Sequence, residues 1–269
     1  MNLKLKKIVV AMAAAGIGLG IAATADAGRV VLTGHDNDYH QSAGAVAATT
    51  AELLWVRASG LPVLVIDNGT EATTLIGGII GAGNVVTRMV GAVTAADFDP
   101  TVYSAFVVAS VESCGGCDNP VGTGTTLAGF SAAINAFFNA GGGIIGETSA
   151  SDPNGFAYVP QAAGTTTPIF AISGFSATAA GTTAMPGFVA VNGDQTHNIF
   201  SEPGYGGVSA AYIVAERFED GTPVTIFADG KIVCTPGKDC VITVPEPGTL
   251  SLLGLALAGL AGFFRRRTS

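Results

Sequence analysis

Basic residues are scarce in the central part of this sequence. The chain has 12 Lys and Arg residues against 20 Asp and Glu residues, and six of the basic residues lie within the first seven and last five positions. Residues 28–244 therefore hold six basic and eighteen acidic residues, a net charge of −12. Because nucleic-acid binding depends on Lys and Arg at the phosphates, this balance excludes nucleic acid as a partner.

Motifs for nucleotide binding and for serine hydrolases are also absent. The first expected strand, residues 29–33, is followed by GHDNDYH and not by the G-x-G-x-x-G of a dinucleotide-binding fold. The sequence contains neither a P-loop nor a G-x-S-x-G elbow. These absences exclude the common nucleotide-binding folds and the α/β-hydrolase site.

The three parts of a secretory signal peptide stand in order at the N-terminus. Residues 1–7 are basic, residues 8–23 are apolar, and Ala25-Asp26-Ala27 is an A-x-A cleavage site. They predict a signal peptide over residues 1–27 and a mature chain that begins near Gly28. An uncleaved membrane anchor is the alternative, but the apolar run is short for a membrane span.

The C-terminus combines a short acidic motif, an apolar run and a basic cluster. Seventeen uncharged residues, 248–264, follow Pro245-Glu246-Pro247 and precede Arg265, Arg266 and Arg267. As a helix this run is about 25 Å long at ~1.5 Å per residue, which is short for a bilayer core of roughly 30 Å. The pattern predicts a single C-terminal transmembrane helix with its arginines on the cytoplasmic side.

This tail resembles the PEP-CTERM sorting signal of Gram-negative bacteria, which has the same VPEP motif, apolar helix and arginine cluster. The resemblance implies that the membrane peptidase exosortase recognises Pro245, Glu246 and Pro247 and removes the tail. It also implies an inner-membrane-anchored precursor, delivered by the secretion machinery, and a mature protein at the cell surface or in the extracellular matrix. An ordinary tail anchor is the alternative.

The four cysteines lie between the two sorting segments, at positions 114, 117, 234 and 240. Their even number and the oxidising compartment of an exported protein favour disulfides. Both close pairs sit in turn-like sequences, SCGGCD and CTPGKDC, so we expect Cys114–Cys117 and Cys234–Cys240. A redox dithiol at Cys114 and Cys117 or half of a zinc site are the alternatives.

Residues 28–244 read as one α/β ectodomain, between a signal peptide (1–27) and a sorting segment (245–269). Apolar strands are expected at 29–33, 61–66, 84–89, 105–110 and 143–146, alternating with helices at 42–59, 73–82 and 125–140. Uniformly apolar strands between helices are typical of a doubly wound, mostly parallel sheet covered on both faces. After residue 149, strands at 168–172, 187–191, 211–218, 223–228 and 231–234 predict an antiparallel edge and a cysteine-closed C-terminal hairpin, with a loop at 173–186.

Three polar segments follow expected parallel strands and should therefore meet at one edge of the sheet. They are residues 35–40, 112–119 and 147–154. The first of them, HDNDYH, contains two histidines and two aspartates, which are ligands for zinc, manganese or iron. The candidate ligand- or metal-binding residues are His35, Asp36, Asp38, His40, Glu147 and His197. A polar turn that caps the next helix is the alternative, and general acid–base chemistry is a second.

Several segments of the body are similar to the class I glutamine amidotransferase-like fold, in its trehalose-utilisation branch. They are the strand that ends in TGH, YSAFVVAS, FFNAGGGIIG and GDQTHNIF, within residues 29–200. The resemblance implies a flavodoxin-like or amidotransferase-like sheet. True amidotransferases carry a nucleophilic cysteine after the strand that matches GIIG, where this chain has Glu147-Thr148-Ser149, so amidotransferase activity is excluded. Ser149 with His197 as base is the remaining nucleophile.

These observations favour an exported surface or matrix protein whose ectodomain is a non-enzymatic ligand- or glycan-binding module, with exopolysaccharide as a candidate partner. An exported metal-dependent hydrolase of carbohydrate-like substrates and a purely structural matrix protein are the alternatives. Fold alone does not decide among them.

Overall fold

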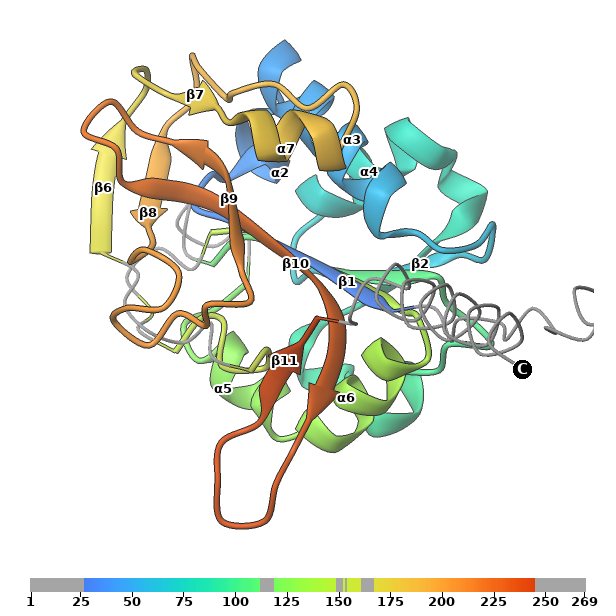
Figure 1. Cartoon of the computed structure of the whole chain (residues 1–269). Helices are drawn as coiled ribbons and strands as arrows, with labels where there is room; N and C mark the ends of the chain where they lie inside the picture. The colour runs from blue at the N-terminus through green and yellow to red at the C-terminus, as the bar shows by residue number, and fades with distance from the viewer. Residues whose placement is uncertain (1–26, 112–118, 149–151, 153, 161–166, 245–269) are drawn as a thin grey trace, which may run out of the picture.

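The computed structural model describes residues 27–111, 119–148, 152, 154–160 and 167–244 (Figure 1). The signal peptide, the sorting tail with its expected transmembrane helix, Cys114, Cys117 and Ser149 lie outside these residues. Within the described ranges, no helix combines the length and the apolar character that a membrane span requires.

A mixed sheet forms the centre of the ectodomain, with strands in the order β3-β2-β4-β5-β1-β10-β9-β7. The first five of these are parallel, and β10, β9 and β7 continue the sheet antiparallel. A short strand, β11, pairs with the far end of β10. The strands are β1 (Gly28–Thr33), β2 (Val63–Ile66), β3 (Val85–Arg88), β4 (Ala105–Val108), β5 (Gly143–Gly146), β7 (Ser176–Ala177), β9 (Ile213–Arg217), β10 (Pro223–Val233) and β11 (Val241–Thr243). This arrangement confirms the predicted α/β sheet with an antiparallel extension.

The strand order corrects the flavodoxin-like part of the prediction. In a flavodoxin-like sheet the first strand lies between the second and third parallel strands. Here β1 lies on the other side of β5 and pairs with β10 along its whole length. The long strand β10 covers the free edge of β1, an arrangement that helix and strand periodicity alone do not specify.

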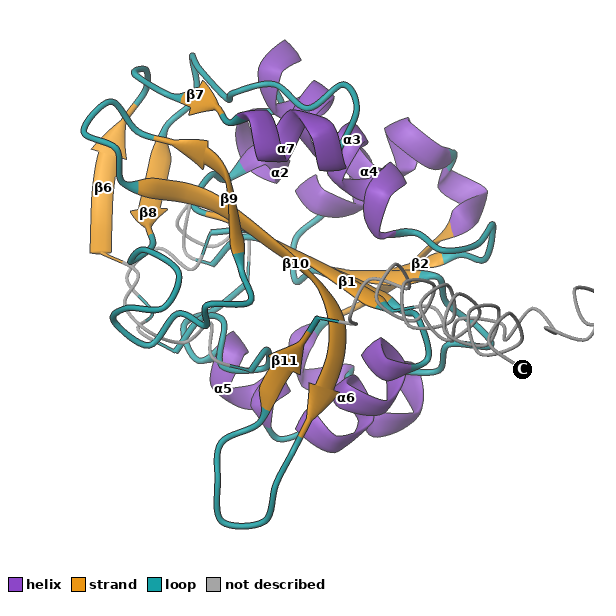
Figure 2. Cartoon of the chain, in the orientation of Figure 1, coloured by secondary structure: helices purple, strands orange, loops and turns teal. Residues whose placement is uncertain are grey.

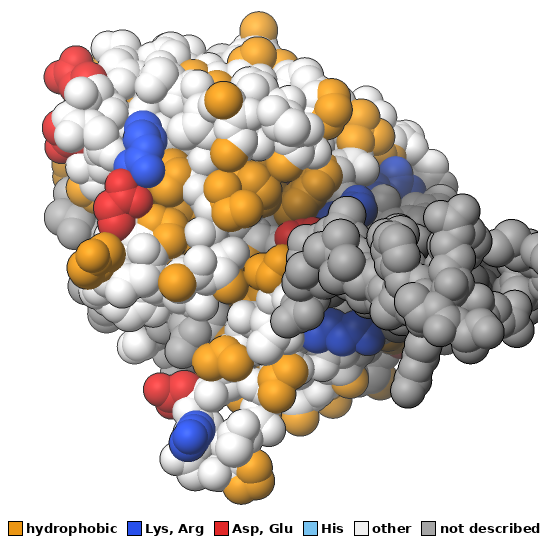
Figure 3. Space-filling view, viewed as in Figure 1, with side chains coloured by type: hydrophobic (Ala, Val, Ile, Leu, Met, Phe, Trp, Pro, Cys, Tyr) orange, Lys and Arg blue, Asp and Glu red, His pale blue; other side chains and the backbone are white. Residues whose placement is uncertain are grey.

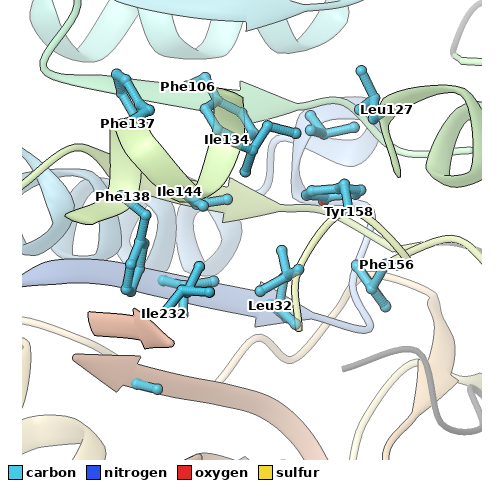
Figure 4. Close-up of a cluster of buried hydrophobic side chains, with 14 of the residues drawn as sticks. Leu32, Phe106, Leu127, Ile134, Phe137, Phe138, Ile144, Phe156, Tyr158 and Ile232 are labelled. Atoms are coloured by element: carbon cyan, nitrogen blue, oxygen red, sulfur yellow. The ribbon is translucent and has the colours of Figure 1, made fainter. Parts of the chain in front are cut away.

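Helices cover both faces of the sheet (Figures 1 and 2). One face carries α3 (Ala43–Val56), α4 (Glu71–Ile80) and α7 (Ala179–Ala184), and the other carries α5 (Thr123–Ala128) and α6 (Ser131–Asn139). Short 3-10 helices, η1 (Ala82–Asn84), η2 (Val90–Ala92) and η3 (Ala95–Asp97), flank β3. Consecutive strand residues therefore enter different cores: Val30 and Leu32 pack on the α5–α6 side (Figure 4), and Val31 packs on the α3–α4 side.

Four local predictions were wrong. The single helix expected at 125–140 is two helices, because Gly129 and Phe130 close a tight turn onto Thr126 and Leu127. The loop expected at 173–186 contains β7 and α7, and no strand forms at 187–191. The two strands expected at 223–228 and 231–234 are one continuous strand, β10.

A two-stranded antiparallel pair, β6 (Thr167–Ala171) and β8 (Thr196–Ile199), flanks the carboxyl end of β1 (Figure 1). The backbone N–H groups of His197 and Asn198 both donate to the carbonyl oxygen of Gly34. The close approach requires glycine, since a Cβ at position 34 would overlap the backbone of Asn198. Residue 34 therefore fixes the place of His197 relative to the end of β1.

The C-terminal hairpin is closed by the disulfide Cys234–Cys240, as predicted. It is also held against α6, where Asn139 donates to the carbonyl of Ile232 and accepts from its N–H at 2.8 and 2.6 Å. In the surface view of Figure 3, uncharged and hydrophobic groups dominate and charged side chains are few.

Candidate functional site

Polar residues converge at the carboxyl ends of β1, β4 and β5. The N–H of Thr148, after β5, donates to the carbonyl of His35, and the N–H of Ser110, after β4, donates to Asp38 at 2.9 Å. The described parts of the three predicted segments thus share one edge of the sheet, which we call the rim. Residues 112–118 and 149–151 of these segments lie outside the described residues.

Asp36, His40 and His197 meet at this rim. Asp36 is the N-cap of the short helix α2 (Asn37–His40), so His40 lies one helical turn further along the same face. One carboxylate oxygen of Asp36, Oδ2, lies 3.3 Å from Nε2 of His40 and 3.0 Å from Nε2 of His197. One donor atom from each of the three residues lies within 4.8 Å of the others. Two imidazoles and a carboxylate are a common donor set for a transition metal.

The backbone beside His40 is in an unusual conformation. Gln41 has φ 49° and is the only non-glycine residue with positive φ in the described part of the chain. Its side chain donates to the carbonyl of Asp38 at 2.8 Å and reaches that of Glu71 at 3.3 Å. A left-handed residue other than glycine costs free energy, so these contacts hold a strained helix end that orients His40.

Two exposed aromatic rings flank the histidines. The ring of Tyr39 stands edge-on to His40 at 5.0 Å and is 43% exposed. Pairing of β6 with β8 places Phe170 edge-on to His197 at 5.9 Å, and Phe170 is 75% exposed. Two exposed aromatic rings therefore adjoin the two histidines that contact Asp36.

His35 lies apart from these three residues and is fully buried. Its Nε2 lies 2.8 Å from a carboxylate oxygen of Glu216, and its Nδ1 lies 2.7 Å from the hydroxyl of Thr196. Thr225 and the N–H of Val191 donate to the same carboxylate. Both ring nitrogens of His35 contact other side chains inside the protein, so the geometry indicates a structural role for this residue and not a ligand-binding one.

Three buried carboxyl groups lie at the rim or close to it: Asp38, Glu52 and Glu147. Burial raises the pKa of Asp38 to about 7, opposed by the Ser110 N–H, and burial with Glu216 nearby raises the pKa of Glu52 to about 8. Burial also raises the pKa of Glu147 well above its usual range, and Asp38 and Glu52 add to the effect. Burial therefore opposes ionisation of all three acids.

Several polar atoms around these acids have no hydrogen-bond partner among the described residues. They include Oδ1 of Asp36, Oδ1 of Asp38, both carboxylate oxygens of Glu52 and of Glu147, and the hydroxyl of Tyr158. Tyr158 lies beside the carboxyl end of β5 (Figure 4), and its hydroxyl occupies the space that a Cβ on Gly146 would need. Unpaired buried polar groups are costly, and such a cluster is typical of a functional site.

Sequence reasoning missed Glu52, Glu216 and Tyr158. Glu52 stands in α3 among apolar and small residues, and its side chain is 1% exposed. An acidic residue on the inner face of an expected helix was the signal that could have identified it. Glu216, in β9, is likewise a charge within an apolar strand.

A hollow of about 700 Å³ lies between the ends of β8, β9 and β10. Its charged residues include Arg217 and Glu202, which form an ion pair with each other. Because this pair is partly exposed and already satisfied, the hollow offers weaker recognition chemistry than the rim.

Comparison with known proteins identifies one segment of the chain. Residues 243–267 match the PEP-CTERM protein-sorting motif. This confirms the resemblance of the tail and marks the chain as an exported protein processed by exosortase. No curated protein and no solved structure matches the chain, so no relative supports the resemblance to the amidotransferase-like fold.

Proposed function

We propose that the ectodomain of this exosortase-sorted protein is a non-enzymatic glycan-binding module whose site is the rim. The observation that carries the proposal is the exposure of Phe170 and Tyr39 beside the histidines that contact Asp36. A sugar ring presents C–H groups on its faces and hydroxyls at its edges. It therefore suits a surface where apolar rings adjoin imidazole and carboxylate groups.

The charge of the ectodomain favours a neutral glycan. Residues 28–244 carry a net charge of −12, and Asp36 and Asp38 lie at the rim itself. An anionic polysaccharide would be repelled by the net negative charge of the ectodomain, whereas a neutral one would not. Neutral exopolysaccharide is thus the ligand class that this surface suits.

Binding to immobilised neutral exopolysaccharide tests the proposal. Phe170→Ala should weaken binding by about fivefold, since an aromatic contact contributes roughly 1 kcal/mol. Ile213→Ala, an exposed apolar residue on β9, is the matched control and should bind as the wild type does. Equal binding by Phe170→Ala and wild type would contradict the proposal.

A metal-dependent hydrolase is the second candidate, and Glu147 favours it. This carboxyl group is buried beside Asp36, has a raised pKa and can hold a proton for a leaving group. Hydrolysis would release new reducing ends from the polysaccharide, and Glu147→Gln would abolish the release while keeping binding. Binding without new reducing ends excludes this candidate.

The sorting motif is expected to control release from the inner membrane. Glu246 is the only charged residue between Asp239 and Arg265, so its loss removes the single charge of the expected recognition motif. Glu246→Ala should leave full-length protein in the inner-membrane fraction, detected by immunoblotting. Mature protein of normal size at the cell surface would show that the motif does not direct sorting.

A further inference from the structure

We propose that Asp36, His40 and His197 form a solvent-accessible site for one divalent transition-metal ion such as Zn²⁺. This inference goes beyond glycan binding and stands without it. The three residues come from α2 and β8, which are distant in sequence and brought together by the contact of β8 with Gly34.

The donor set selects the class of metal. Two imidazole nitrogens and one carboxylate oxygen suit Zn²⁺, Mn²⁺ or Fe²⁺, whereas Ca²⁺ and Mg²⁺ prefer oxygen ligands alone. The three donor atoms lie within 4.8 Å of one another, and Oδ2 of Asp36 faces both nitrogens. Ligands of a Zn²⁺ ion lie about 2.0–2.2 Å from the metal, so small side-chain shifts would complete the site.

A second observation also points to a cation. Asp36 is fully buried, and its Oδ1 atom has no hydrogen-bond partner among the described residues. Leaving a buried carboxylate oxygen unpaired is costly, and an ion bound by both carboxylate oxygens of Asp36 would satisfy it. The shared Oδ2 contact with the histidines leaves this second oxygen unsatisfied.

The positive side chains of the described arginines do not oppose a cation at this site, because each arginine is engaged elsewhere. Arg29 donates to Trp55, Arg57 to Leu61 and Ser104, Arg88 to Asp97, and Arg217 to Glu202. No arginine in the described ranges is therefore placed to neutralise the rim.

Backbone contacts hold His40 and His197 in place, and the side of the site at His40 is open to solvent. The strained Gln41 holds the end of α2, and the N–H of His197 is bonded to Gly34. His40 keeps 33% of its side chain exposed, so the ion would retain a coordination position for water or a hydroxyl-bearing ligand.

Calorimetric titration of the metal-free, full-length chain in detergent with ZnCl₂ tests the proposal. The wild type should bind one equivalent, and CoCl₂ should give the d–d absorption of a low-coordinate Co²⁺ ion. His40→Ala and His197→Ala should each weaken Zn²⁺ binding by at least about 100-fold, since even outer-shell changes cost roughly 10–100-fold. Glu202→Gln, an exposed carboxylate of an ion pair elsewhere, is the control.

The His40→Ala variant separates loss of metal binding from misfolding. This side chain is partly exposed, so its loss should leave the thermal unfolding midpoint of the metal-free protein unchanged. Addition of Zn²⁺ should raise the thermal midpoint of the wild type and not that of His40→Ala. The proposal is overturned if the wild type binds no Zn²⁺, if both histidine variants bind it normally, or if Ca²⁺ binds more tightly. Zn²⁺ titration without polysaccharide measures metal binding by itself, so failure of glycan binding and failure of metal binding remain distinguishable.

Discussion

Replacement of Glu52 by glutamine should make the stability of the ectodomain less dependent on pH. Glu52 lies in α3, is 1% exposed, and has no hydrogen-bond partner for either carboxylate oxygen among the described residues. Burial, with Glu216 nearby, raises its pKa from 4.5 to about 8. The protonated acid is therefore the form that the folded chain favours.

The sign of the effect follows from the raised pKa. Stability associated with the protonated acid is complete below pH 4.5 and is lost as the pH rises toward 8. The loss is about 1.4 kcal/mol for each pH unit in this window, so it reaches about 3 kcal/mol at pH 7. Glutamine does not ionise and escapes this loss, so Glu52→Gln should gain about 3 kcal/mol over the wild type between pH 4 and pH 7.

Urea unfolding of the metal-free protein at pH 4, 5.5 and 7 measures this difference. Any constant effect of the amide group cancels in the comparison across pH. The result is therefore the change with pH of the difference in unfolding free energy between Glu52→Gln and the wild type. Glu219→Gln, an exposed carboxylate in the turn after β9, controls for the loss of one charge. A difference that stays flat from pH 4 to pH 7 would refute the reasoning, and one that falls would mean that Glu52 pairs with a cation.

Three other substitutions test the supports of the rim and of the hairpin. Gly34→Ala should destabilise the protein by about 1–3 kcal/mol in urea unfolding and weaken Zn²⁺ binding, because the new Cβ displaces β8; unchanged binding would show that β8 does not position the site. His35→Ala should cost about 3–5 kcal/mol, because Glu216 loses its buried partner; a loss under 1 kcal/mol would mean that the pair is not structural. The double change Cys234→Ser and Cys240→Ser should cost about 2 kcal/mol under non-reducing conditions and nothing under reducing ones.

The parallel half of the sheet was predictable because its strands are apolar on both faces. LPVLVI, AFVVAS and GIIG lie between helices and contain β2, β4 and β5, and all residues of these strands are buried. β8 was missed as a strand because THNI contains a single apolar residue and is buried through hydrogen bonds. Its partner β6 and the anchor at Gly34, both distant in sequence, determine its conformation.

The candidate site was predictable in part for a similar reason. Polar segments after parallel strands share an edge, which correctly placed Asp36, Asp38 and Glu147 near one another. The separate environment of His35 depends on Glu216, which enters from β9 on the antiparallel side of the sheet. Hydrophobic patterns carry no information about which of two neighbouring histidines turns inward.

The hairpin at the end of the ectodomain lies directly before the sorting motif. β11 ends at Thr243, and the sorting motif begins at the same residue. Only Val244 separates this paired residue from Pro245, and each residue extends at most about 3.6 Å, so the tether is only about 7 Å long. In the folded ectodomain the last paired residue is therefore separated from Pro245 by a single residue. If the hairpin has not closed, more unpaired residues lie between the folded part of the chain and the motif. The length of this unpaired segment therefore differs between folded and unfolded precursors.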